Sequence, residues 1–151
     1  MEELVLEFPT YGREKDAKAY INELSSSNSK FNGCDDLEKF EDYRAWVDRV
    51  VDWNKGVNLP KDYAQAITYF VVRAEDNRLI GMVNIRYGVT EENDKRGVGH
   101  IGSGVRPTER KKGYGTEILK KCLEECKKYN LPEIHLNVNS ENISAIRTIE
   151  K

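Results

Sequence analysis

The chain has 151 residues, enough for a single domain that buries roughly 70% of the surface its unfolded form exposes. Charged residues make up 33% and hydrophobic residues 38%, with a net charge of −2, so we expect a soluble globular protein and no nucleic-acid partner. No apolar run approaches the ~20 residues of a membrane span, and the start lacks a signal peptide's basic residues. Three cysteines do not suit a disulfide framework, and a metal site at Cys122 and Cys126 would need partners, for which only the two histidines exist, far off in sequence. These features predict a cytoplasmic protein.

The first sixty residues are expected to hold one short strand and two helices. Residues 4–8 favour a strand, and apolar residues recur along one helix face in 13–24. Asp36 is placed to cap the second helix, where Trp46 and Trp53 lie seven residues apart and are expected in the core. The apolar stripe of this helix consists of Phe40, Tyr43, Val47, Val50 and Val51.

The second half favours three strands, a helix, a fourth strand and a final helix. The expected ranges are 66–73, 79–87 and 99–105 for the three strands, up to 130 for the helix, 133–139 for the fourth strand and about 140–149 for the final helix. The first two of these strands are joined by a tight turn, as in an antiparallel hairpin. The later strand–helix–strand crossover implies a parallel pair, so we expect an α+β fold with a mixed, mostly antiparallel sheet.

A cationic turn between strand and helix is the most informative stretch of the sequence. It spans 105–117 and carries the basic residues Arg106, Arg110, Lys111 and Lys112, followed by Gly113 and Gly115. The first N–H groups of a helix lack carbonyl partners, and glycine lets a ligand approach the backbone closely. The stretch therefore predicts a phosphate site, although its spacing matches neither a P-loop nor a G-x-G-x-x-G fingerprint. The alternative is a solvated basic helix start with a structural glycine turn.

This turn resembles the acyl-CoA pyrophosphate loop of the GNAT N-acetyltransferase superfamily. The resemblance rests on R-x-x-G-x-G at Arg110, Gly113 and Gly115, preceded by V-x-P at 105–107. It continues at 142–151, where N-x-x-A and E-K look like a second segment of the family. The run 99–107 is also similar to a group of bacterial predicted acetyltransferases. The expected order of strands and helices agrees with the GNAT arrangement.

The resemblance implies acetyl-CoA as co-substrate, with no metal. Backbone N–H groups of the turn would hold the pyrophosphate, Lys111 or Lys112 would meet the 3′-phosphate, and the Ser103 and Val105 backbone would bond the pantetheine. The residues expected at the cofactor are Ser103, Val105, Arg110, Lys111, Lys112, Gly113, Tyr114, Gly115, Thr116 and Asn142.

The resemblance leaves the catalytic residues less well defined. His100 stands where many members carry a strand glutamate and is the expected base, since its pKa near ~6.5 suits proton transfer at neutral pH. The alternative, a histidine that fills space at a strand edge, is equally weighted. Ile149 occupies the position of the family's usual tyrosine acid. The acid is then Ser144, a water, another tyrosine such as Tyr87 or Tyr114, or absent.

Charge asymmetry suggests the acceptor. Residues 1–60 carry 13 acidic and 8 basic side chains, whereas 105–128 carry 8 basic and 4 acidic ones. The resemblance places acceptor contacts near the acidic stretch 35–42, so we expect an N-acetyltransferase acting on a primary amine of a small molecule or peptide by direct attack. The alternative is a non-catalytic module that binds or senses acyl-CoA. The family continues past E-K, so we expect 1–151 to be one domain truncated at its C-terminus, and a homodimer stays open.

Overall fold

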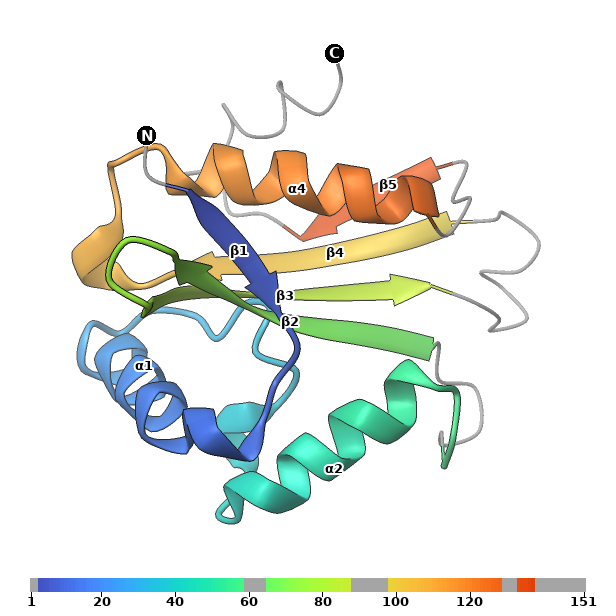
Figure 1. Cartoon of the computed structure of the whole chain (residues 1–151), viewed down its shortest axis with the longest axis horizontal. Coiled ribbons are helices and arrows are strands. Elements are labelled where there is room, and N and C mark those ends of the chain that lie inside the picture. The colour runs from blue at the N-terminus through green and yellow to red at the C-terminus, as the bar shows by residue number, and fades with distance from the viewer. Residues whose placement is uncertain (1–2, 59–64, 88–97, 129–132, 138–151) are drawn as a thin grey trace.

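A five-stranded sheet forms the centre of this computed structural model, which describes residues 3–58, 65–87, 98–128 and 133–137 (Figure 1). The strands lie in the order of the chain: β1 (Leu4–Glu7), β2 (Gln65–Arg73), β3 (Arg78–Tyr87), β4 (Val98–Val105) and β5 (Glu133–Asn137). Each of the first four is antiparallel to its neighbour, and β5 runs parallel to β4. The expected α+β fold with a largely antiparallel sheet is confirmed.

Among the described residues, three α-helices cover the two faces of the sheet. Figure 1 shows α1 (Glu14–Ser26) and α2 (Tyr43–Asn54) below the sheet and α4 (Tyr114–Lys128) above it. Successive side chains of a strand point to opposite faces, so β2 contributes Phe70 to the α1/α2 layer and Val71 to the α4 layer. The sheet therefore separates two hydrophobic clusters, one beneath each helical layer.

The start of α2 differs from the sequence prediction. The Asp42 carboxylate accepts hydrogen bonds from the backbone N–H groups of Arg44 (3.0 Å) and Ala45 (3.4 Å), so Asp42 is the N-cap, and the expectation for Asp36 was wrong. Asp36 has a left-handed backbone (φ 64°) and precedes a short 3₁₀ helix, η2 (Leu37–Lys39). Its side chain caps nothing there.

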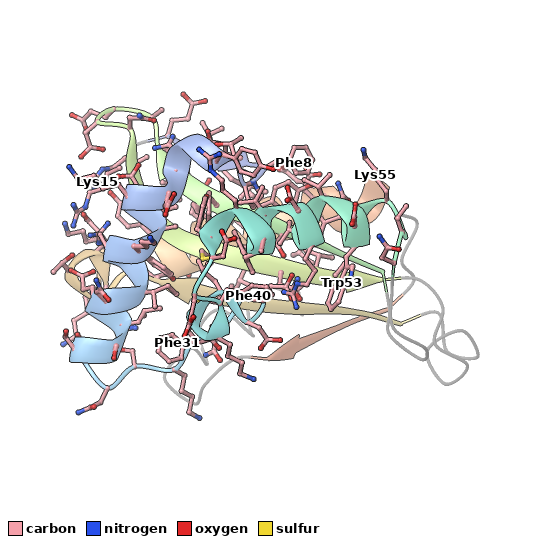
Figure 2. All side chains as sticks on the ribbon, turned by 90° about the horizontal axis from the view of Figure 1, so that it is seen from below. Phe8, Lys15, Phe31, Phe40, Trp53 and Lys55 are labelled. Atoms are coloured by element: carbon pink, nitrogen blue, oxygen red, sulfur yellow. The ribbon has the colours of Figure 1, made fainter. Side chains whose placement is uncertain are left out.

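The two tryptophans of α2 have different environments. Trp46 is fully buried, stacks on Phe70 with ring centroids 5.9 Å apart, and donates from Nε1 to the Asp35 carbonyl (3.0 Å). Trp53 is half-buried beneath the Arg49 guanidinium, which lies 4.2 Å from its ring centroid. Figure 2 shows this layer from below with Trp53 labelled. The core expectation is thus confirmed for Trp46 and wrong for Trp53, which lies outside the buried cluster.

Candidate functional site

The cationic turn leaves β4 and reaches α4 through two left-handed residues. The backbone N–H of Arg106 donates to the Ile80 carbonyl (2.6 Å), which ties the end of β4 to β3. A short 3₁₀ helix, η3 (Pro107–Glu109), follows, with proline in its first turn. The chain then turns at Lys111 (φ 64°) and Gly113 (φ 84°) and enters α4. Glycine has no steric cost in this conformation, which explains Gly113 as part of the turn.

The N-terminus of α4 is open to a ligand. The Glu117 N–H donates to the Gly113 carbonyl (3.3 Å), so the N–H groups of the preceding residues have no acceptor within the helix. A Cβ added at Gly115 would meet nothing within 4 Å in the described part of the chain. Lys111 and Gly113 are exposed beside this opening. Outward N–H groups, a positive helix end and an uncovered glycine are together suited to an anion such as a phosphate.

A buried carboxylate holds the turn in place. Glu109 is only 4% exposed and accepts from Arg73 Nη1 (2.8 Å), Arg78 Nε (2.8 Å) and Lys112 Nζ (2.9 Å). Burial alone would raise the pKa of Glu109, but the hydrogen bonds from Lys112, Arg73 and Arg78 outweigh it and lower the pKa to about 2. Glu109 therefore stays charged and ties η3 to both strands of the β2–β3 hairpin beside its turn. This role of Glu109 was not predicted from the sequence. The feature that could have indicated it is a single acidic residue within a run of basic residues.

The expected cofactor residues of the turn have unequal roles. Tyr114 is 3% exposed, packs in the α4-side core and accepts a hydrogen bond from Arg73 Nη1 (3.1 Å), so only its backbone can face a ligand. Lys112 is committed to Glu109, and Arg110 Nε donates to the Val105 carbonyl (3.1 Å). Lys111 is exposed at the opening, which makes it the better placed of the two candidate lysines.

The end of β4 provides a second part of the site. Its pairing with β5 runs from Val98–Glu133 to Gly102–Asn137, whereas its pairing with β3 continues to Val105. On the side of β4 that faces away from β3, no described strand therefore pairs with the segment from Ser103 onward. Ser103 and Val105 are half-buried there.

The loop between α1 and α2 packs onto this same part of β4. A Cβ added at Gly104 would lie 2.8 Å from the Asn32 carbonyl and 3.2 Å from the Tyr20 hydroxyl. A Cβ added at Gly33 (φ 76°) would lie 2.8 Å from the Gly102 carbonyl. Glycines on both sides thus permit backbone-to-backbone contact. The contact brings the expected acceptor side of the molecule to the end of β4.

Part of the acidic stretch 35–42 is used internally. The Asp35 carboxylate accepts from Thr68 Oγ1 (3.0 Å) and pairs with Arg49 Nη2 (3.0 Å). Asn84 Nδ2 donates in turn to Thr68 Oγ1 (3.0 Å), which completes a buried chain from α2 across β2 to β3. Asp36 and Glu41 are exposed. Only some of these carboxylates are therefore accessible to an acceptor.

Several expected site residues lie outside what the structure describes. The backbone of His100 pairs with Arg86 on β3 and with His135 on β5, but its side chain is outside the described atoms. Asn142, Ser144 and Ile149 lie outside the described residues altogether, as does the expected final helix. The roles assigned to these residues stay predictions.

Two further observations concern the described residues alone. They include no group of three or more histidine, cysteine, aspartate or glutamate side chains able to hold a metal ion. None of their helices is both long and apolar enough to span a membrane.

Comparison with known proteins identifies the family. The model of the acetyltransferase (GNAT) family matches residues 21–151, while a search of curated proteins finds no match. The fold is similar to glucosamine-6-phosphate N-acetyltransferase from Arabidopsis thaliana, with a TM-score of 0.66 and 13% identity over 99% of this chain and 92% of that one. It is also similar to a dodecameric spermidine N-acetyltransferase from Vibrio cholerae, with a TM-score of 0.60 and 20% identity over 97% of this chain and 76% of that one. A third similar structure is a microcin C7 self-immunity acetyltransferase in complex with acetyl-CoA and AMP, with a TM-score of 0.66 and 13% identity over 99% of this chain and 77% of that one.

The family model covers most of the chain, including the turn between β4 and α4 where the sequence predicts a phosphate site. The protein belongs to the GNAT family and is an acetyl-CoA-dependent acyltransferase.

Proposed function

We propose that the protein transfers the acetyl group of acetyl-CoA to a primary amine of a small molecule or peptide. The observation that carries the proposal is the open N-terminus of α4, where the backbone at Gly115 is uncovered and Lys111 is exposed. Such a helix start binds the pyrophosphate of a nucleotide through N–H groups and the helix dipole. Thr116, half-buried in the first turn of α4, would add a hydroxyl donor.

The end of β4 is the proposed site for the pantetheine part of the cofactor. On the side of β4 that faces away from β3, no described strand pairs with residues 103–105. Free backbone N–H and C=O groups at a sheet edge can pair with an extended ligand that carries amide groups, as pantetheine does. The thioester would then lie near Gly104, close to the α1–α2 loop.

The acceptor is proposed to be cationic before reaction. Asp36, which pairs with Lys39 (3.4 Å), and Glu41 are exposed in the same α1–α2 loop whose Asn32 and Gly33 meet β4, and carboxylates attract an ammonium group. Two structurally similar proteins are named for amine-bearing substrates, glucosamine-6-phosphate and spermidine, which supports the same class here. A base, proposed to be His100, would take the ammonium proton so that the neutral nitrogen attacks the thioester carbonyl. We also propose a cytoplasmic location and a homodimer.

The test is Gly115→Glu, with Gly12→Glu as its matched control. Both glycines have room for a side chain, and both substitutions change the net charge equally. Glutamate is a better helix former than glycine and is favourable near a helix N-terminus, so Gly115→Glu should keep or raise thermal stability. Its carboxylate would occupy the place proposed for the pyrophosphate. Calorimetric titration should show acetyl-CoA affinity at least about tenfold lower in Gly115→Glu and unchanged in Gly12→Glu.

The outcomes separate the parts of the proposal. Equal acetyl-CoA affinity in wild type and Gly115→Glu would refute the assigned site, and no binding by the wild type would refute the function. Acetylation of a panel of primary amines, followed by mass spectrometry, tests the acceptor class. Transfer confined to neutral or anionic acceptors would refute the amine assignment.

A further inference from the structure

Tyr20 carries a polar group that the fold leaves unused. The residue lies on the inner face of α1, between Ala17 and Leu24, and is 0% exposed. Its hydroxyl has no hydrogen-bond partner in the part of the chain that the structure describes. Buried hydroxyl groups are nearly always hydrogen-bonded, because one without a partner destabilises the fold. Phenylalanine at this position would fill the same core space without that penalty.

The hydroxyl is aimed at the end of β4. It lies 3.2 Å from the point that a Cβ of Gly104 would occupy, and Figure 1 shows α1 beneath this end of the sheet. Gly104 is two residues past Gly102, where the described pairing of β4 with β5 ends. A side chain on residue 104 would separate the hydroxyl from the strand, and glycine keeps the approach clear.

The surroundings keep this hydroxyl neutral. Burial raises the pKa of Tyr20 well above its ordinary value, and the cations of Arg110 and Arg106 lower it only in part. The nearby Cys34 raises the pKa further, and the Met82 backbone lowers it. A neutral phenol sheltered from water is a fixed hydrogen-bond donor, and such donors stabilise an oxyanion strongly.

We propose that Tyr20 is a catalytic residue whose hydroxyl donates a hydrogen bond to the carbonyl oxygen of the bound thioester. The inference rests on the proposed function, because it needs the thioester near Gly104. The amine nitrogen forms a bond to the carbonyl carbon, and the C=O electron pair moves onto oxygen, where Tyr20 stabilises the negative charge. When the C=O bond re-forms, the C–S bond breaks and its electron pair leaves with sulfur. The base already holds the ammonium proton, so the nitrogen loses its second proton to the departing thiolate, directly or through water, and Tyr20 keeps its own.

This role differs from the acid that the sequence leaves undefined. A tyrosine whose pKa is raised by burial transfers a proton poorly, whereas hydrogen-bond donation needs no transfer. A CoA thiolate can leave without a strong acid, since thiol pKa values lie near ~8.5. Tyr20 would thus supply charge stabilisation rather than a proton.

The experiment compares Tyr20→Phe with Tyr43→Phe. Tyr43 is also buried, but its hydroxyl donates to the Thr10 carbonyl (2.5 Å), so its loss should lower stability without affecting catalysis. Tyr20→Phe should fold at least as stably as wild type, because it removes a hydroxyl that has no partner. Thiol release would be followed with the best acceptor of an amine panel, or with water if no amine reacts. In Tyr20→Phe, kcat should fall by about 100-fold.

A binding readout separates this role from a structural one. CoA lacks the acetyl carbonyl, so CoA affinity should be unchanged in Tyr20→Phe while acetyl-CoA affinity falls severalfold. Wild-type kcat together with a wild-type ratio of acetyl-CoA to CoA affinity would overturn the inference and leave the proposed function intact. A parallel loss of both affinities, or of stability, would also overturn it, because the hydroxyl would then support the fold. No binding of acetyl-CoA to the wild type would refute the proposed function itself.

Discussion

Substituting Glu109 with glutamine tests whether one buried charge holds the cofactor turn. Glutamine keeps the shape of the side chain but removes its charge, so Arg73, Arg78 and Lys112 lose a common counterion. Arg73 keeps Asp76 as a second partner (2.7 Å). Removing one member of a buried charged network usually costs more than the network itself contributes, because the remaining charges stay desolvated.

The size of the effect follows from the pKa. The folded protein lowers the pKa of Glu109 from its ordinary value of 4.5 to about 2, and ~1.4 kcal/mol corresponds to each pKa unit, so the contribution is about 3 kcal/mol at most. The Arg78 and Lys112 side chains are 35% and 52% exposed, and solvent screening reduces that value. We therefore expect Glu109→Gln to lower the free energy of unfolding by about 1 to 3 kcal/mol at pH 7. The melting temperature of a chain this long should fall by roughly 2 to 10 °C.

The pH dependence gives the prediction its sharpest form. Because the pKa of Glu109 is lower in the folded state, its contribution is complete above pH 4.5 and is lost as the pH falls toward 2. Urea unfolding followed by circular dichroism at several pH values would measure the stability difference between wild type and Glu109→Gln. That difference should shrink across this window. The control is Glu75→Gln in the exposed β2–β3 turn, expected within about 0.5 kcal/mol of wild type. An effect of Glu109→Gln no larger than the control, or one that persists unchanged to pH 2, would refute the reasoning.

Two further substitutions test the start of α2 and the contact beneath β4. Asp42→Ala should lower the free energy of unfolding by about 1 kcal/mol because two backbone N–H groups lose their acceptor. Asp36→Gly, which removes the side chain without straining the left-handed backbone, should change it by less than about 0.5 kcal/mol, and equal effects in urea unfolding would contradict the assignment of the cap. Gly104→Ala should cost about 1 to 3 kcal/mol, since its Cβ would lie 2.8 Å from the Asn32 carbonyl. Gly12→Ala, with space around it, is the control, and a neutral Gly104→Ala would show that the α1–α2 loop does not pack there.

The sequence predicts the sheet and helices well because their periodicities are local. The alternation in β2 and β3 and the helical spacing in α4 reflect burial against one face, and a side chain's periodicity reports that burial directly. The turn between β4 and α4 is predictable for the same reason: basic residues, two glycines and the following helix are adjacent in the chain. The positive φ of Gly113 is what a glycine turn requires, while phosphate binding there stays a prediction.

The features that sequence reasoning missed depend on contacts between distant residues. Asp36 and Asp42 are both acceptable caps by residue type, and only the left-handed backbone of Asp36 decides between them. Glu109 gains its role from Arg73 and Arg78, more than thirty residues away in a hairpin. The Tyr20 hydroxyl is unusual only because β4 folds back onto α1 at Gly104. The spacing of residues in the sequence does not indicate such contacts between distant segments.

Counts of acidic and basic residues do not show which of these charges are available to bind a ligand. The basic turn and the acidic front half suggest two ligands of opposite sign, but many of these charges are paired inside the protein. Lys112 pairs with Glu109, and Asp35 pairs with Arg49. The opening at Gly115 and the edge of β4 depend instead on backbone groups, whose position is fixed by those internal pairs. The charges therefore act first to hold backbone N–H and C=O groups in place, and under the proposed function these backbone groups, rather than the charges, would recognise the thioester cofactor.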